Sequence, residues 1–363
     1  MAYFYDDLNP QPTKRRRGFT WASAIATVVL LGIVAMSALP TPYVIERPGG
    51  AFNVLGTDHN TEIISVIDAP SYETDGALDL LTVEILGAPN HTPSWLELFF
   101  AWLDPAQSII PLEDIYPSNV SQTKVDQANI SMFADSQQSA LAVALIKLGY
   151  RLNSKLIVNS LATDAAATGK LAAGDQIVSI DSVKLTDYGM LTKAIQGSKG
   201  KALVLEVVAA KGVTRSETIT PKLVDGSYRI GAYVASKYEF PINVKLQLQD
   251  IGGPSGGMMF ALGIYDKLTP GALTGGQIIA GTGTIDDSGT VGPIGGIREK
   301  LYSAQRAGAK WFLAPKDNCN EVVGHIPAGL HVAQVETFDQ ALSAVQSIAS
   351  GKGSDLAGCS TTK

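Results

Sequence analysis

The segments Gly253-Pro-Ser-Gly-Gly257 and Pro293-Ile-Gly-Gly-Ile-Arg-Glu-Lys300 are the most informative parts of this chain. In each of them, glycine-rich backbone surrounds one reactive side chain: the hydroxyl of Ser255 in the first and the amine of Lys300 in the second. Glycines let backbone N–H groups approach a bound carbonyl oxygen closely, as an oxyanion site requires. Together the two segments supply a nucleophile and an amine that can deprotonate it.

A serine hydroxyl is a weak nucleophile unless a base lies beside it, and lysine serves as that base only when its amine is kept neutral. Lys300 follows apolar and small residues and opens a helical pattern that continues through Leu301, which predicts a packed position. Taken alone, each segment has an ordinary alternative, because Gly-Pro-Ser-Gly is a common turn and a lysine at a helix start is usually a solvated charge. Their joint presence favours a serine–lysine hydrolase.

Three motifs in this order, the two segments above and Ala280-Gly-Thr-Gly-Thr-Ile285 between them, resemble the proteolytic domain of Lon-type proteases. The resemblance covers about residues 228–350. It implies that Ser255 is the nucleophile, that Lys300 is the general base and that Thr282 orients the two.

Two positions depart from the pattern of that family. The alanine that usually follows the nucleophile is Gly256 here, and the glutamate of the family's Thr-Gly-Glu strand is replaced by Thr284. Neither change removes a catalytic group. Gly253 and Gly256 flank the hydroxyl, so we expect them to support the site.

Residues from about 126 to 222 contain a second recognisable pattern. The stretch Ala165-Ala-Ala-Thr-Gly-Lys-Leu-Ala-Ala-Gly-Asp-Gln-Ile-Val-Ser-Ile-Asp181 places a glycine–aspartate turn before a strand at 176–180, and segments 185–195 and 202–209 predict a helix and a further strand. This order resembles a PDZ domain, which adds a bound peptide as an extra strand and receives its terminal carboxylate on backbone N–H groups. The resemblance implies a carboxylate loop and a pocket wall, formed by Leu148, Gly149 and Tyr150 and by Leu191 and Ile195, respectively.

The stretch from Phe19 to Leu39 is uncharged and apolar, and it is long enough to cross the hydrocarbon core of a bilayer as a helix. Basic residues at 14–17 precede it directly, and the positive-inside rule therefore predicts a cytoplasmic N-terminus with the rest of the chain outside the cytoplasm. A cleaved signal peptide also has a basic start and an apolar middle, but the length of this run favours an uncleaved anchor in the cell membrane.

The run Ser94-Trp-Leu-Glu-Leu-Phe-Phe-Ala-Trp-Leu103 is dense in apolar and aromatic side chains but too short to span a bilayer. Two interpretations remain open for it. It is either a helix docked on the core, or a helix that rests on the lipid surface or in a lid-like groove.

The composition excludes several classes of protein. With 45% hydrophobic and 17% charged residues among 363, the chain can bury more than one core, and its net charge of −6 argues against nucleic acid as a partner. The sequence contains no Gly-x-x-x-x-Gly-Lys-Ser/Thr phosphate loop, so we expect no ATP requirement and no cofactor. Its histidines stand in no catalytic or metal-binding motif, so we expect no metal. Cys319 and Cys359 form a disulfide or stay free.

The sequence therefore predicts a multidomain chain of the α/β and α+β classes. Its predicted parts are a cytoplasmic N-terminus (1–18), a transmembrane helix (19–39), a strand-rich segment that packs on the protease domain (40–125), a PDZ-like β-rich domain (126–222), a Lon-type proteolytic α/β domain (223–350) and a flexible tail (351–363).

The predicted function is ATP-independent cleavage of exported or membrane-associated polypeptides by a membrane-anchored serine endopeptidase, with the PDZ-like module binding peptide segments. The alternative is a non-catalytic PDZ scaffold or an adaptor for exported proteins. The expected partners are polypeptide substrates and the cytoplasmic membrane. Homo-oligomerisation is left open.

Overall fold

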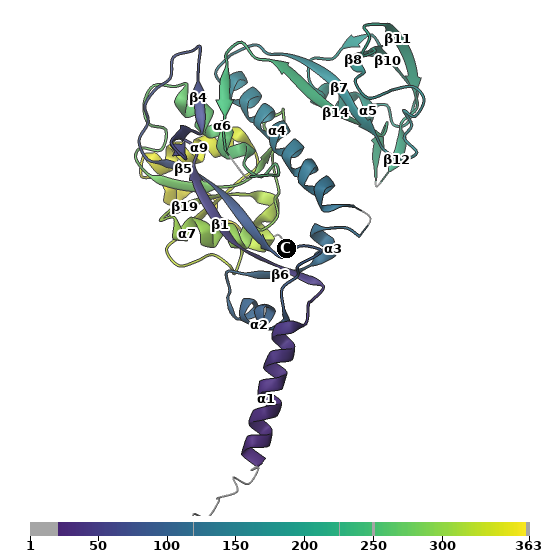
Figure 1. The fold of residues 1–363 in the computed structure, drawn as a ribbon. Coiled ribbons are helices and arrows are strands. Elements are labelled where there is room, and N and C mark those ends of the chain that lie inside the picture. The colour runs from purple at the N-terminus through teal and green to yellow at the C-terminus, as the bar shows by residue number, and fades with distance from the viewer. Residues whose placement is uncertain (1–20, 119, 225, 249–250, 361–363) are drawn as a thin grey trace, which may run out of the picture.

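The structure is a computed structural model that describes residues 21–118, 120–224, 226–248 and 251–360. It contains an N-terminal helix, a larger α/β unit and a smaller β-rich unit (Figure 1). The predicted cytoplasmic N-terminus and its basic residues at 14–17 lie outside the described residues.

One six-stranded sheet forms the centre of the larger unit, in the order β20-β19-β16-β5-β1-β6. β5, β16, β19 and β20 are parallel, whereas β1 is antiparallel to both β5 and β6. Strands from residues 43–111 therefore share a sheet with strands from residues 278–335. The bounds are β1 (Tyr43–Asn53), β5 (Ala77–Leu86), β6 (Ser108–Pro111), β16 (Ile278–Gly281), β19 (Trp311–Pro315) and β20 (His331–Val335).

Helices cover both faces of this sheet, and its strands alternate between the two cores. Ile279 and Leu313 pack under α4, α6 and α9, whereas Ala280 and Phe312 pack under α7 and α8. The bounds of the helices are α3 (Leu112–Ile115), α4 (Gln122–Lys147), α6 (Gly257–Lys267), α7 (Ile297–Arg306), α8 (Cys319–Val322), α9 (Phe338–Ala349) and the 3₁₀ turns η1 (Lys316–Asn318) and η2 (Gly353–Asp355).

The smaller unit has its own sheet, in the order β11-β10-β8-β7-β14, and its own core around Leu156, Ile177 and Leu205. β8 coincides with the predicted strand at 176–180, but the predicted helix at 185–195 begins only at Tyr188, because the Asp187 side chain caps it by accepting from Met190 N–H. The bounds are β7 (Asn153–Leu161), β8 (Gln176–Ile180), β9 (Val183–Lys184), α5 (Tyr188–Gly197), β10 (Leu203–Val208), β11 (Thr214–Ile219), β12 (Lys222–Val224), β13 (Ser227–Arg229) and β14 (Ala232–Glu239).

The structure corrects the predicted boundaries of 126–222. Residues 140–145 of α4 are buried in the core of the larger unit, and β14 completes the sheet of the smaller one by pairing with β7. The sequence pattern alone does not show to which unit the helix before β7 and the strands after residue 222 belong. Their packing in the folded protein decides it.

The predicted flexible tail is also corrected for residues 351–360, since 361–363 lie outside the described part. Gly353 is buried against the indole of Trp311, Gln334 N–H donates to the carbonyl of Ala357, and Cys359 is disulfide-bonded to Cys319. These contacts hold the glycine- and serine-rich segment on the sheet.

Short strand pairs complete the larger unit. They are β2 (Thr57–Asp58) with β3 (Thr61–Glu62), β4 (Ile64–Val66) with β15 (Val244–Leu246), and β17 (Thr284–Ile285) with β18 (Val291–Gly292).

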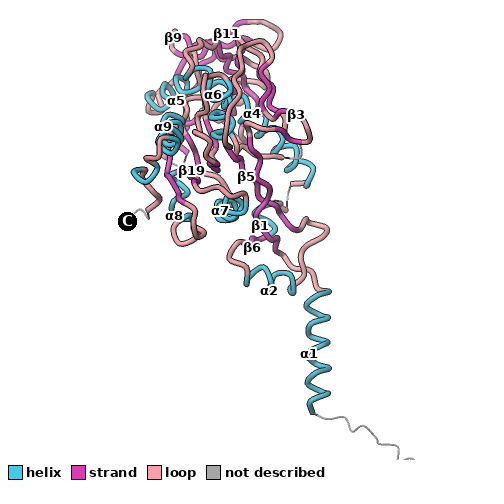
Figure 2. The backbone as a smooth tube through the Cα atoms, turned by 90° about the vertical axis from the view of Figure 1, so that its left-hand side faces the viewer, coloured by secondary structure: helices cyan, strands magenta, loops and turns pink. Residues whose placement is uncertain are grey.

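Helix α1 (Trp21–Ala38) extends away from the folded units and has no buried residue (Figure 1). Among the described residues it is the one helix long and apolar enough to cross a membrane, a property that signal sequences share. It lies within the predicted span of 19–39. Helix α2 (Trp95–Leu103) lies beside the end of α1, where the chain enters the larger unit (Figure 2).

Candidate active site

Ser255 lies in the turn directly before α6, a helix that is buried along most of its length. Gly253 has a φ of +84°, which favours glycine, and its N–H donates to the carbonyl of Asn129 on α4 at 2.9 Å. The carbonyl of Pro254 accepts from the Ser136 hydroxyl of α4, also at 2.9 Å. Helix α4 thus holds the turn in place and directs the N-terminal end of α6 toward the serine.

Gly256 stands where the Lon-type pattern usually has alanine, and a neighbouring side chain explains the glycine. A Cβ at this position would lie 2.4 Å from Cδ1 of Leu80 on β5, although the backbone itself, with φ of −94°, would accept a side chain. Leu80 therefore fills the space that the methyl group of an alanine at position 256 would need. Gly257 is enclosed as well, since its Cβ would meet Ser136 Oγ at 2.6 Å and Ile285 Cγ2 at 2.8 Å.

Lys300 reaches the serine from α7, on the other face of the sheet. Its side chain is only 2% exposed, and its Nζ lies 2.8 Å from Ser255 Oγ and 3.0 Å from Thr282 Oγ1. Helix α7 starts after Gly296, whose φ of +66° and close approach to Val83 require glycine. The first turn of α7 is thereby pressed onto β5.

Thr282 follows the last residue of β16 and joins the other two residues. Its hydroxyl donates to the carbonyl of Ser255 at 3.0 Å, and the N–H of Gly283 donates to the same carbonyl at 2.8 Å. Because the proton of Thr282 is used in this way, its oxygen is free to accept from Lys300. A neutral lysine amine that donates to Thr282 keeps its lone pair available for the proton of Ser255.

The charge of Lys300 is set by burial. Desolvation lowers the pKa of its amine from 10.5 to about 8, and the nearby carboxylate of Glu46 partly opposes this shift. Glu46 is itself buried on β1, and burial raises the pKa of its carboxyl group to about 7. The negative charge of Glu299 adds to this rise, and the positive charge of protonated Lys300 opposes it. The amine is therefore neutral in a large fraction of molecules at mildly alkaline pH.

A cleft of about 510 Å³ opens beside Ser255 and Lys300. Gly253 and Gly256, the two glycines expected to support the site, line it. One part of its walls combines glycines with apolar side chains, among them Gly49, Gly50, Phe52, Leu80 and Phe133, and another part is polar, with Asp58, His59, Thr82 and Glu84. Such a surface suits the backbone and apolar side chains of an extended polypeptide.

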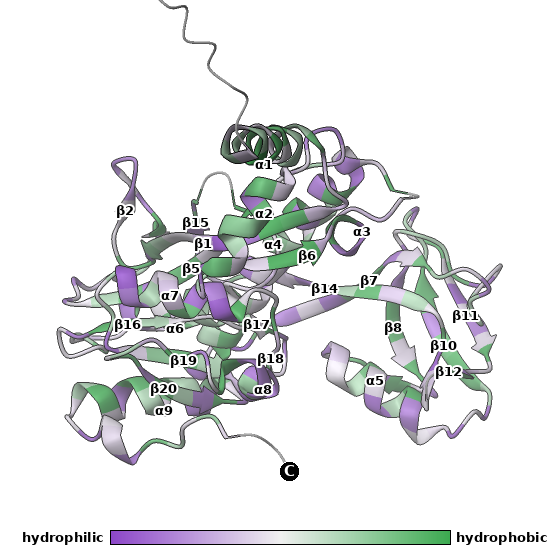
Figure 3. Ribbon diagram, turned by 90° about the horizontal axis from the view of Figure 1, so that it is seen from below, coloured by the Kyte–Doolittle hydropathy of each residue, from purple (hydrophilic) through white to green (hydrophobic). Residues whose placement is uncertain are grey.

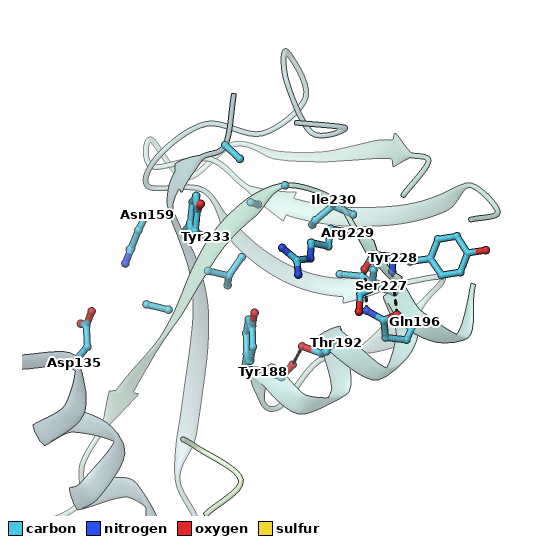
Figure 4. Close-up of a pocket in the computed structure, with 16 residues that line it drawn as sticks. Asp135, Asn159, Tyr188, Thr192, Gln196, Ser227, Tyr228, Arg229, Ile230 and Tyr233 are labelled. Carbon is cyan, nitrogen blue, oxygen red and sulfur yellow. Dashed lines mark hydrogen bonds between the residues drawn. The ribbon is translucent and has the colours of Figure 1, made fainter. Parts of the chain in front are cut away.

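A second cavity, of about 580 Å³, lies between α5 and β14 in the smaller unit (Figure 4). Tyr188, Thr192 and Gln196 line it from α5, and the Gln196 amide is hydrogen-bonded to the backbone of Tyr228. We call this cavity the α5–β14 groove. β14 pairs with β7 and ends the order of its sheet, so its other edge faces the groove.

The structure brings only some of the residues predicted for peptide binding to this groove. Ile195 lines it and Leu191 is buried beneath it, but Leu148, Gly149 and Tyr150 follow the end of α4 and do not line it. Residues 228–231 line it instead; they comprise the last two residues of β13 and the two-residue turn into β14, and we call them loop 228–231. The prediction placed the carboxylate loop at 148–150, before the first strand of the unit, whereas the strand that borders the groove is β14, the last one.

Sequence reasoning also missed Glu46, which influences Lys300 although it lies far away in the sequence. A glutamate within the apolar strand pattern Tyr43-Val-Ile-Glu was the available signal for a buried carboxyl group. For loop 228–231, the signal was a glycine between apolar residues at the start of a strand, Ile230-Gly-Ala-Tyr-Val234. No group of three or more potential metal ligands is found in the part of the chain that the structure describes.

Removing either reactive group should abolish acylation of the serine. We expect Ser255→Ala to show no labelling by a serine-reactive peptidyl probe, because the nucleophile is gone. Lys300→Met should be labelled at least about 10²-fold more slowly than the unaltered protein, because the base is gone. Thr282→Val should slow labelling by about tenfold, because one N–H of the lysine is left without its acceptor. Arg306→Ala, an exposed change on the same helix, is the control. Unchanged labelling of Lys300→Met would contradict the dyad.

The rate of probe labelling should rise with pH through about 8 and then level off, because the protonated amine cannot accept a proton. Glu46→Gln removes a carboxylate that raises the pKa of Lys300, so its profile should lie at lower pH than that of the unaltered protein. The profile of Glu62→Gln, which changes an exposed carboxylate on β3, should not move. A shift of the Glu46→Gln profile to higher pH would show that this electrostatic account is wrong.

Comparisons with known proteins agree with the geometry of this site. Residues 153–347, more than half of the chain, match the family described as the Lon protease (S16) C-terminal proteolytic domain. The Lon protease of Azospirillum brasilense is 31% identical over 172 residues, covering 47% of this chain and 20% of that protein. Lon protease 1 of Herpetosiphon aurantiacus is 31% identical over 163 residues, covering 45% of this chain and 18% of that protein. The matched region spans about a fifth of the length of these relatives.

Among solved structures, the PDZ domain of the SdrC-like protein of Listeria innocua is similar to this chain, with 24% identity and a TM-score of 0.21. The similarity covers 22% of this chain and 92% of the Listeria chain.

The family match begins at β7 and ends within α9, so it includes Ser255, Thr282 and Lys300 but none of the strands at 43–111. The chain belongs to the Lon protease (S16) C-terminal proteolytic domain family, and its enzyme class, as predicted, is that of a serine peptidase.

Proposed function

We propose that this protein is a membrane-anchored serine endopeptidase that cleaves exported or membrane-associated polypeptides without using ATP. The observation that carries the proposal is the 2.8 Å contact between Ser255 Oγ and the buried amine of Lys300. A buried amine of lowered pKa beside a hydroxyl is the arrangement that activates serine when no histidine is present. A scaffold has no need to bury a lysine beside a serine hydroxyl in this way.

In the proposed reaction, Lys300 takes the proton of Ser255 as Oγ attacks the carbonyl carbon of the scissile peptide bond. The C–N bond then breaks, the proton passes from Lys300 to the leaving amine, and an ester remains on Ser255. A water molecule, deprotonated by Lys300, releases the carboxylic acid and restores the serine. Backbone N–H groups of the turn that carries Ser255, directly before α6, stabilise the oxyanion in both steps.

Several features support a location outside the cytoplasm and close to the membrane. The apolar helix α1 follows a basic segment in the sequence, and the disulfide between Cys319 and Cys359 suits an oxidising compartment. From Pro40, just after α1, to Gly49 in the cleft, the chain is at most roughly 30 Å long when extended. The proposed substrates are therefore polypeptide segments that come near the bilayer surface.

The α5–β14 groove is proposed to bind peptide ends as a PDZ domain does. An extended peptide would pair with the free edge of β14, and α5 would form the opposite wall. The carboxylate would be received at loop 228–231, where Arg229 supplies a positive charge (Figure 4). The apolar side chains of Ile195, Ile230 and Val234 favour an apolar last residue.

We expect the full-length protein in detergent micelles to cleave unfolded, fluorescein-labelled casein at the same rate with and without ATP and Mg²⁺. Ser255→Ala should give no cleavage, which excludes a contaminating protease as the source. Casein that is bound but left intact by the unaltered protein would favour the scaffold or adaptor. A rate that depends on ATP would contradict the proposed independence.

Filling the groove should weaken peptide binding without affecting the fold. We expect Thr192→Trp to bind a labelled hexapeptide with a free C-terminal valine at least about tenfold more weakly in fluorescence anisotropy, a loss of about 1.4 kcal/mol. Lys193→Trp, the neighbouring exposed position on α5, is the matched control and should bind normally. Equal binding of the same peptide with an amidated C-terminus would show that loop 228–231 does not read the carboxylate.

A further inference from the structure

Helix α2 has two different faces. Leu98 and Ala101 are buried against Ile45 of β1, which docks the helix on the larger unit. The rest of the helix presents large apolar side chains to solvent, with Trp102 73% and Phe100 61% exposed. The exposed set is Trp95, Phe99, Phe100, Trp102 and Leu103. A patch of this kind on one short helix marks an interaction surface.

The chain fixes this patch next to the end of α1. Pro40, two residues after α1, forms a β-bridge with Ser94, which caps the start of α2. The Thr41 hydroxyl donates to the carbonyl of Pro93 at 2.9 Å, and the Thr41 N–H donates to the Thr92 hydroxyl at 3.3 Å. Pro40 lies at most about 7 Å from Ala38 along the chain, and a bridge partner such as Ser94 lies about 5 Å further. The start of α2 is therefore held within about 12 Å of the last residue of α1.

The thickness of a bilayer shows which membrane layer lies beside α2 when α1 spans the hydrocarbon core. An 18-residue helix is about 27 Å long, which nearly matches the roughly 30 Å hydrocarbon core. The headgroup layer adds about 5–8 Å on each side. If α1 crosses the membrane, the position of α2 coincides with this layer, in which tryptophan side chains are enriched.

The orientation and charge of α2 also suit the lipid surface. Figures 1 and 2 show α2 crosswise to α1, and Figure 3, seen from the α1 side of the molecule, shows α2 beside α1. Glu97 is the one charged residue in the helix, and it is used in the capping box with Ser94. The exposed residues that follow Glu97 in the helix, Phe99, Phe100, Trp102 and Leu103, carry no charge.

We propose that α2 is an interfacial helix whose aromatic face inserts into the outer headgroup region of the bilayer. This inference rests on the proposed membrane anchoring by α1. It gives the protein a second membrane contact, through Trp95, Phe99 and Trp102, which stops the folded units from turning freely about α1. The cleft is then kept in a fixed orientation above the lipid surface.

Tryptophan quenching by brominated lipid separates this inference from the anchoring on which it rests. Three full-length variants would each keep one tryptophan, namely Trp21, Trp102 or Trp311, with phenylalanine at the other three positions. Each is reconstituted in phosphatidylcholine vesicles with and without dibrominated acyl chains, after checking that Ser255 still reacts with the probe. Trp311 lies in β19, remote from α1, and defines the unquenched level.

We expect Trp21 and Trp102 to lose most of their emission in brominated vesicles and Trp311 to keep its emission. Quenching of Trp21 without quenching of Trp102 would overturn the inference and leave the anchor in place, and the patch would then be assigned to a second copy of the chain. Lack of quenching at Trp21 would refute the anchoring itself. Should the multiple replacements unfold the chain, the unaltered protein and its Trp102→Phe variant give the same comparison, because the emission lost between them belongs to Trp102.

Discussion

The hydrogen bond between Lys300 Nζ and Ser255 Oγ joins α7 to the turn that precedes α6, two helices that cover opposite faces of the six-stranded sheet. A sheet separates the side chains on its two faces, so the contact is possible only where a strand ends. That place is the carboxyl end of β16, a strand of four residues, and Thr282 occupies it. Gly281 and Gly283 flank Thr282 because a Cβ at either would collide with Met259 or Val291, respectively. The short strand and its glycines are what bring nucleophile and base together.

Burial then gives this contact its chemistry. A lysine amine in water is protonated at physiological pH, and desolvation in the α7–sheet interface lowers its pKa to about 8. The surroundings that desolvate it include β1, which also contributes Glu46. Strands β1, β5 and β6 lie outside the region that matches the family, yet β5 shapes the space beside the nucleophile through Leu80. The N-terminal strands are therefore part of the catalytic unit.

Helix α4 connects this unit with the α5–β14 groove. Asn129 and Ser136 of α4 are hydrogen-bonded to the turn that carries Ser255, while Asp135, on the same helix, lines the groove. At the other end of the molecule, α1 and α2 lie together below β1 (Figure 1). Helix α4 therefore contacts both the turn of the nucleophile and the groove, while α1 and α2 adjoin the opposite part of the larger unit.

Features that depend on neighbouring residues could be predicted from the sequence. The turn at Ser255, the start of α7, the strand at 176–180 and the apolar helix all follow from local preferences of glycine, β-branched and apolar residues. Only the tertiary structure decided that β1 pairs with β5, that Glu46 influences Lys300, that loop 228–231 rather than 148–150 lines the groove, and that Cys359 fixes the tail. Each of these is a contact between distant segments, and its free energy comes from burial and desolvation that no local pattern records.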